Sequence, residues 1–79
     1  MNNKNWETSD LGLATTISLF YPIKNIDKTN PKKVQFIFEN SKKLNLLIKD
    51  YWKGKIKVDP SAYFNQLRVM KSRIYDKCL

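Results

Sequence analysis

The chain has 79 residues, which is enough for one domain with one hydrophobic core and too few for two. Its hydrophobic fraction of 42% and aromatic fraction of 13% are typical of a folded protein and exclude a disordered tail. Lys and Arg number 15 against 7 Asp and Glu, and the net charge of +8 attracts polyanions such as nucleic acid. An A- and T-rich coding sequence gives the same excess of Lys and Asn, so the charge permits such binding without demonstrating it.

The composition argues against catalysis. The chain has no histidine and one cysteine, which removes the commonest general base and the commonest metal ligands. Two glycines are too few for a glycine-rich phosphate loop, and the seven acidic residues are scattered. We therefore expect no enzyme activity, no metal and no cofactor. The apolar runs are shorter than a membrane span or a signal peptide requires, which predicts a cytoplasmic protein that does not bind membranes.

A polar arm is predicted before the folded part begins. Residues 1–7 are expected to be flexible, and residues 8–79 to form a single small basic domain. Trp6 is the large aromatic residue of the arm, so we expect it either to dock on the domain or to anchor a partner.

The first predicted helix covers about residues 9–21. Thr8 or Ser9 can cap its start, and Asp10 in the first turn suits the positive end of the helix dipole. Pro22 disfavours helical geometry at the residue before it and so ends the helix. The apolar side chains of this segment share one face: Leu11, Leu13, Ala14, Ile17, Phe20 and Tyr21.

A β-hairpin is predicted over residues 23–39. Its turn contains Asn30, Pro31 and several lysines, and its second strand alternates Val34, Phe36 and Phe38 with less apolar residues. One face of this strand is therefore expected to pack on the core.

Two more helices follow the hairpin. The first is predicted over 41–53, with a cap at Asn40–Ser41 and Gly54 as the left-handed residue after its end. Residues 55–58 alternate polar and apolar side chains, which indicates an extended segment that can pair as a third strand. Asp59 and Pro60 are start signals for the last helix, expected over about 60–76. Its inner stripe is Tyr63, Leu67, Met70 and Ile74.

These elements predict an α+β fold, in which a two- or three-stranded antiparallel sheet is covered by three helices. Basic side chains gather at the hairpin tip, on the 55–58 segment and beside the inner stripe of the last helix. The residues that we expect to contact nucleic-acid phosphates are Lys32, Lys33, Lys55, Lys57, Arg68, Lys71 and Arg73. Trp6 and Tyr75 are the candidates for a contact with a partner.

Several stretches of the chain together resemble a known family. They are Thr8–Ala14, Ile26–Glu39, Asp50–Gly54, Val58–Pro60, Tyr63–Asn65 and Lys71–Tyr75. With them the chain is similar to a family of short prokaryotic and phage-associated domains of unknown function, over about residues 8–76. The resemblance implies a self-standing domain and brings no activity, cofactor or catalytic residue. Its mobile-element setting suggests nucleic-acid transactions or interference with a host.

Three functional hypotheses follow from the sequence. The leading one is a non-enzymatic module that binds DNA or RNA through electrostatic contacts with the backbone. The second is a small adaptor or inhibitor that binds another protein. An exposed apolar patch would support this hypothesis, and the candidate positions for it are Trp6, Ile37, Ile56 and Tyr75. The third is a homodimer joined through the edges of its short strands, as an alternative to a monomer.

Overall fold

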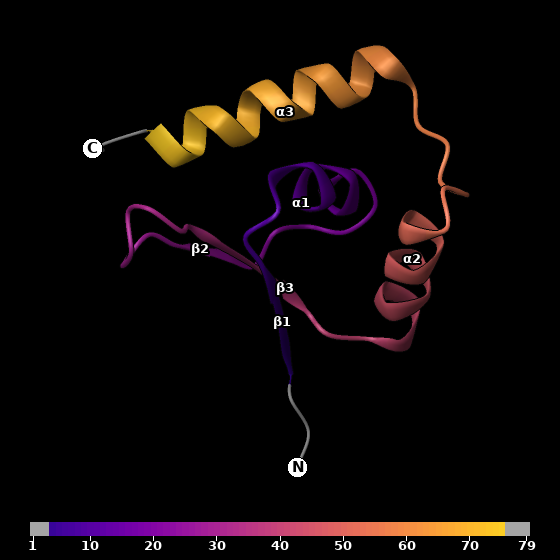
Figure 1. The fold of residues 1–79 in the computed structure, drawn as a ribbon, viewed down its shortest axis with the longest axis horizontal. Helices are drawn as coiled ribbons and strands as arrows, with labels where there is room; N and C mark the ends of the chain where they lie inside the picture. Colours follow the sequence, from indigo (N-terminus) through magenta and orange to yellow (C-terminus); the bar gives the residue numbers. More distant parts are fainter. Residues whose placement is uncertain (1–3, 76–79) are drawn as a thin grey trace.

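The computed structural model describes residues 4–75, in which three helices accompany a three-stranded antiparallel sheet (Figure 1). β3 is the central strand, with β1 on one side of it and β2 on the other. The predicted α+β class is therefore confirmed. In chain order the elements are β1 (Asn5–Thr8), α1 (Leu11–Ser18), β2 (Asn25–Asp27), β3 (Gln35–Glu39), α2 (Lys42–Trp52) and α3 (Pro60–Tyr75).

β1 is formed by the segment that the sequence predicts to be a flexible arm. It pairs antiparallel with β3, with Trp6 opposite Phe38 and Thr8 opposite Phe36. Because paired residues point to the same face of a sheet, Trp6 lies on the core side, and its ring centroid is 6.4 Å from that of Phe38. The expected flexibility is thus wrong for residues 5–7, while residues 1–3 lie outside the described part of the chain.

The third strand of the sheet is β1 and not the predicted segment 55–58. The 23–39 hairpin is confirmed as β2 and β3, with Ile26 opposite Phe36. The 55–58 segment, in contrast, is a loop without strand pairing. Ile56 and Val58 are half-buried, whereas Lys55 and Lys57 are exposed. The alternation that resembles a strand therefore comes from a loop that turns every second side chain inward.

α1 is shorter than predicted at both ends. Its N-cap is Asp10, whose Oδ1 accepts the N–H of Leu13 at 3.1 Å. Thr8 is not the cap, since it belongs to β1 and its hydroxyl accepts the N–H of Asp10. After Ser18 the chain closes a final tight turn, in which the N–H of Tyr21 donates to the carbonyl of Ile17 at 2.8 Å. Residues 19–21 therefore leave the helix before Pro22.

The boundaries of α2 and α3 follow local signals that the sequence contains. The hydroxyl of Ser41 accepts the N–H of Leu44 at 3.0 Å and caps α2. Gly54 has a φ of 72°, the left-handed conformation expected after a helix end. Asp59 Oδ2 accepts the N–H of Ala62 at 2.9 Å and caps α3, which begins at Pro60. The predicted helix end at residue 76 lies outside the described part.

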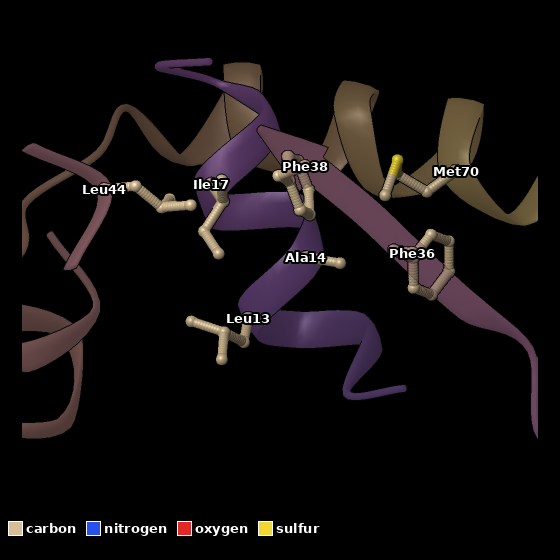
Figure 2. Close-up of a cluster of buried hydrophobic side chains, with 7 residues drawn as sticks. All are labelled: Leu13, Ala14, Ile17, Phe36, Phe38, Leu44 and Met70. Carbon is tan, nitrogen blue, oxygen red and sulfur yellow. The ribbon is translucent and has the colours of Figure 1, made fainter. Parts of the chain in front are cut away.

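α1 lies at the centre of the molecule, between α3 and the sheet (Figure 1). Five successive residues of this helix, 13–17, are buried. The hydroxyls of Thr15 and Thr16 donate to the carbonyls of Leu11 and Gly12, which satisfies these two polar side chains inside the core. β3, α2 and α3 add buried apolar side chains around it (Figure 2). The fully buried apolar residues are Leu13, Ala14, Ile17, Phe36, Phe38, Leu44 and Met70.

Two tyrosines, Tyr51 of α2 and Tyr63 of α3, lie beside the start of α1. A Cβ atom added to Gly12 would lie 3.4 Å from the hydroxyl of Tyr51 and 3.6 Å from that of Tyr63. It would also lie 3.5 Å from Oδ1 of Asp10, so both hydroxyls gather close to this carboxylate. Burial of the Tyr51 ring raises the pKa of its hydroxyl, and the charge of Asp10 and the neighbouring Tyr63 raise it further. The side chains of Tyr51 and Tyr63 thus bring α2 and α3 close together beside the start of α1.

The two faces of β1 make unequal contributions to stability, and this can be measured. Replacing Trp6 with Ala removes the ring that packs on Phe38, and we expect it to lower the free energy of unfolding by about 2 kcal/mol. Glu7→Ala changes an exposed side chain on the opposite face of the same strand and should have almost no effect. Urea unfolding followed by circular dichroism compares the two variants. Equal losses would contradict the packing of β1 described above.

The tyrosine cluster predicts a loss of stability at alkaline pH. Because the folded-state pKa of Tyr51 is raised, its contribution is fully present below the unfolded pKa of about 10 and is lost as the pH rises through the folded pKa. Tyr51→Phe should therefore flatten the curve of unfolding free energy at pH values from about 10 upwards. Tyr75→Phe, which changes an exposed tyrosine, is the matched control and should leave the curve unchanged. A Tyr51→Phe curve as steep as that of the wild type would refute the assignment.

Candidate functional site

The outward side of α3 is the main candidate for a functional surface. The helix turns Tyr63, Leu67, Met70 and Ile74 towards the rest of the protein, which confirms the predicted inner stripe. The other side chains of α3 are exposed, except the half-buried Gln66. They include Arg68, Lys71 and Arg73, so three of the expected phosphate-binding residues are exposed on one helix.

Arg68 is central on this surface. It lines two open depressions along α3, which lie on either side of it. One depression is lined by Asn65, Arg68, Val69, Ser72 and Arg73, and the other by Phe64, Leu67, Arg68 and Lys71. Of the residues that line the two depressions, the cations were predicted from the sequence as site residues. Asn65, Val69 and Ser72, which lie between the cations, were not. The available signal was their spacing, opposite the apolar stripe at helical periodicity.

The other four expected cations lie beyond the two ends of α3. Lys55 and Lys57 are exposed in the loop that leads into its first turn. Lys32 and Lys33 are exposed in the turn between β2 and β3, which projects on the same side of the molecule as the C-terminal end of α3 (Figure 1). The structure therefore divides the predicted site into a central group on α3 and two flanking pairs of lysines.

Short polar side chains shape the turn that carries Lys32 and Lys33. Oδ1 of Asn30 accepts the N–H of Lys32 at 3.0 Å, and the carbonyl of Asn30 accepts that of Lys33. At the base of the turn, Asp27 accepts the N–H of Thr29 at 2.9 Å. Hydrogen bonds from the side chain and backbone of Thr29 hold the pKa of Asp27 below its usual value. The two lysines are thus presented on a turn with several internal hydrogen bonds.

The positive charges of these groups are not neutralised within the described residues. Between residues 4 and 75, the side chains of the seven expected cations make no ion pair and no hydrogen bond. An exposed cation without a carboxylate partner contributes its full charge to the surrounding potential, apart from screening by salt. The surface of α3 and its flanks is therefore electrostatically open to an anionic partner.

The outer face of the sheet has the opposite character. It is the face turned away from α1, and Glu7, Asp27 and Glu39 all point to it because they alternate with the core residues. The three strands contain neither Lys nor Arg. Lysines adjoin the strands at their ends: Lys4, Lys24 and Lys28, of which Lys24 donates from Nζ to Oδ1 of Asn5 at 2.7 Å. Three carboxylates thus lie on the outer face of the sheet, and the cations of α3 lie on the other side of α1.

The two residues expected to contact a partner differ in their surroundings. Trp6 was expected either to dock on the domain or to anchor a partner. It is half-buried against Phe38, a position that corresponds to docking on the domain. Tyr75 is the last residue of α3 and 76% exposed, which leaves its ring accessible.

The described residues lack two other kinds of site. Residues 4–75 contain no group of three or more His, Cys, Asp or Glu side chains that could hold a metal ion. Over the same range, the helices are too short or too polar to cross a membrane. Every buried side-chain nitrogen and oxygen that the structure describes has a hydrogen-bond partner, so this part of the core holds no polar group waiting for a ligand.

Comparison with known proteins places the chain in a family. No curated protein and no solved structure matches it. Residues 3–76 match the family described as "Domain of unknown function (DUF5659)", which covers nearly all of the chain, including β1. The resemblance to a family of domains of unknown function is confirmed at that level. The chain belongs to the DUF5659 family.

Proposed function

We propose that this protein is a non-enzymatic nucleic-acid-binding module that uses α3 and the lysines flanking it to contact phosphates. The observation that supports this most directly is the group of Arg68, Lys71 and Arg73, all exposed on α3 and without carboxylate partners in the described chain. Phosphate groups are the commonest targets of such basic surfaces.

The distribution of charge adds to the case. A net charge of +8 spread evenly would be consistent with a solubility effect alone. Here the acidic residues Glu7, Asp27 and Glu39 lie on the outer face of the sheet, whereas α3 between Pro60 and Tyr75 contains cations and no acidic residue. The lysine pairs at residues 32–33 and 55–57 extend this positive charge beyond the two ends of the helix.

The binding should depend steeply on salt. Neutralising phosphates releases counterions, so the logarithm of the affinity falls with that of the salt concentration by about 0.9 for each phosphate contacted on duplex DNA. The triple variant Arg68→Ala, Lys71→Ala, Arg73→Ala should bind fluorescent DNA more weakly and with a shallower slope. Fluorescence anisotropy at a series of salt concentrations measures both quantities.

A matched control separates the α3 surface from net charge. Lys42, Lys43 and Lys49 are exposed on α2, and replacing all three with Ala removes the same charge from another helix. This variant should keep most of the affinity and slope of the wild type. If the two triple variants lose equal affinity, the assignment to α3 is wrong, and if the wild type binds neither DNA nor RNA at low salt, the proposed function is wrong.

A protein-binding adaptor or inhibitor is the second candidate. It is favoured by large apolar side chains at the surface, among them Trp52 at 65% and Phe64 at 59% exposed. Of the four positions that would form its patch, Tyr75 is exposed, whereas Trp6, Ile37 and Ile56 are half-buried. Nuclease treatment during affinity purification distinguishes the candidates, because partners bridged by nucleic acid are lost and direct protein partners are retained.

The remaining expectations are part of this proposal. They are a cytoplasmic location, a prokaryotic or phage setting, and a monomer or a dimer through the strand edges. β1 and β2 are the edge strands that such a dimer would use.

A further inference from the structure

The ridge of α3 opposite its buried stripe has a composition that phosphate binding does not require. Ser72 and Asn65 lie seven residues apart, so at 3.6 residues per turn they share one line along the helix. This line lies almost opposite Met70, the residue of α3 that is fully buried. Arg68 and Val69 lie on either side of it. The ridge therefore carries an amide, a hydroxyl, a guanidinium and a small apolar group.

These are the side chains that distinguish bases in the major groove of DNA. Arg donates two hydrogen bonds to guanine, Asn makes a bidentate pair with adenine, and Ser bonds to several base edges. A small apolar side chain such as that of Val69 contacts the methyl group of thymine. Asn65, Arg68 and Ser72 make no side-chain hydrogen bond within residues 4–75, so their polar groups are available.

The cations beside the ridge are placed for the walls of the groove. Lys71 and Arg73 are the sequence neighbours of Ser72, and each is rotated by about 100° from it around the helix, in opposite directions. A helix lying with Ser72 towards the floor of a groove would therefore turn Lys71 to one phosphate backbone and Arg73 to the other. Phosphate contacts of this kind set the register in which base contacts form.

The dimensions of α3 fit this position. It has 16 residues, which corresponds to about 24 Å, and a helix with its side chains is about 10–12 Å across. The major groove of B-form DNA is about 12 Å wide and admits a helix, whereas that of double-stranded RNA is too narrow for side chains to read. Figure 1 shows α3 along one edge of the molecule with no other element outside it. Its outer side is thus free to enter a groove.

We propose that α3 inserts into the major groove of double-stranded DNA and reads its sequence, with Arg68 and Asn65 contacting base edges and Lys71 and Arg73 contacting the two backbones. This inference rests on the proposed function and narrows it from nucleic acid to duplex DNA with a preferred sequence. It changes the expectation of purely electrostatic recognition, because the polar residues between the cations are part of the surface.

Selection from a randomised duplex library with the full chain tests the inference. We expect enrichment of a short motif that contains guanine and adenine. Asn65→Ala should weaken binding to the selected duplex by about 10- to 100-fold and relax the preference at one position, while binding to a random duplex stays the same. Lys71→Ala is the matched control and should weaken binding to both duplexes alike. Circular dichroism verifies the fold of each variant.

Arg68→Lys provides a second variant that conserves charge. Lysine lacks the planar fork with which arginine makes two parallel hydrogen bonds, so this variant should keep its affinity for random duplex and lose the preference for guanine. A structural or purely electrostatic role for Arg68 would not produce this split, because the charge remains and the residue is exposed.

The outcomes distinguish this inference from the proposed function. Salt-dependent binding without any enriched motif overturns base reading and leaves the phosphate-binding function standing. A motif that Asn65→Ala and Arg68→Lys do not alter also overturns the role of α3. Preference for RNA or single-stranded DNA over duplex DNA refutes insertion into the groove, and absence of binding to every nucleic acid refutes both proposals.

Discussion

The burial of α1 is the constraint on which the rest of the structure depends. A helix of eight residues is too short to be stable in water by itself, because helix nucleation is costly and few hydrogen bonds follow it. α1 is stable here because its residues 13–17 are enclosed by the sheet, α2 and α3. Thr15 and Thr16 tolerate this enclosure since their hydroxyls bond within the helix. The other elements are therefore arranged so that together they cover α1.

The central place of α1 also explains why most of the surface of α3 is exposed. With α1 supplying much of the buried apolar surface, α3 needs only one narrow stripe centred on Met70 to hold it in place. The hydroxyl of Tyr63 lies near Gly12 and Asp10 at the start of α1, away from the outer side of α3. Most of the circumference of a 16-residue helix thus remains available for other side chains, and these include both arginines of the chain.

Local chemistry made much of the fold predictable. Ser41, Gly54 and Asp59 act on residues within one helical turn, so their roles can be read from neighbouring positions. β1 could not be predicted in this way, because its partner β3 is about thirty residues away and its own sequence is mostly polar. The same limit applies to the site. Exposure of the lysines and arginines follows from their type, whereas the assembly of some of them on one face, with acids on the other, depends on how distant elements pack.

The acidic outer face of the sheet has a kinetic consequence. A molecule with opposite charges on opposite sides is an electric dipole, and near a polyanion it rotates until its positive side leads. In the proposed binding to nucleic acid, collisions would therefore occur preferentially with α3 in front, and a larger share of them would be productive than random orientation allows. Removing Glu7, Asp27 and Glu39 would raise the overall attraction yet weaken this alignment. The carboxylates farthest from the partner would thus help to determine how quickly it is engaged.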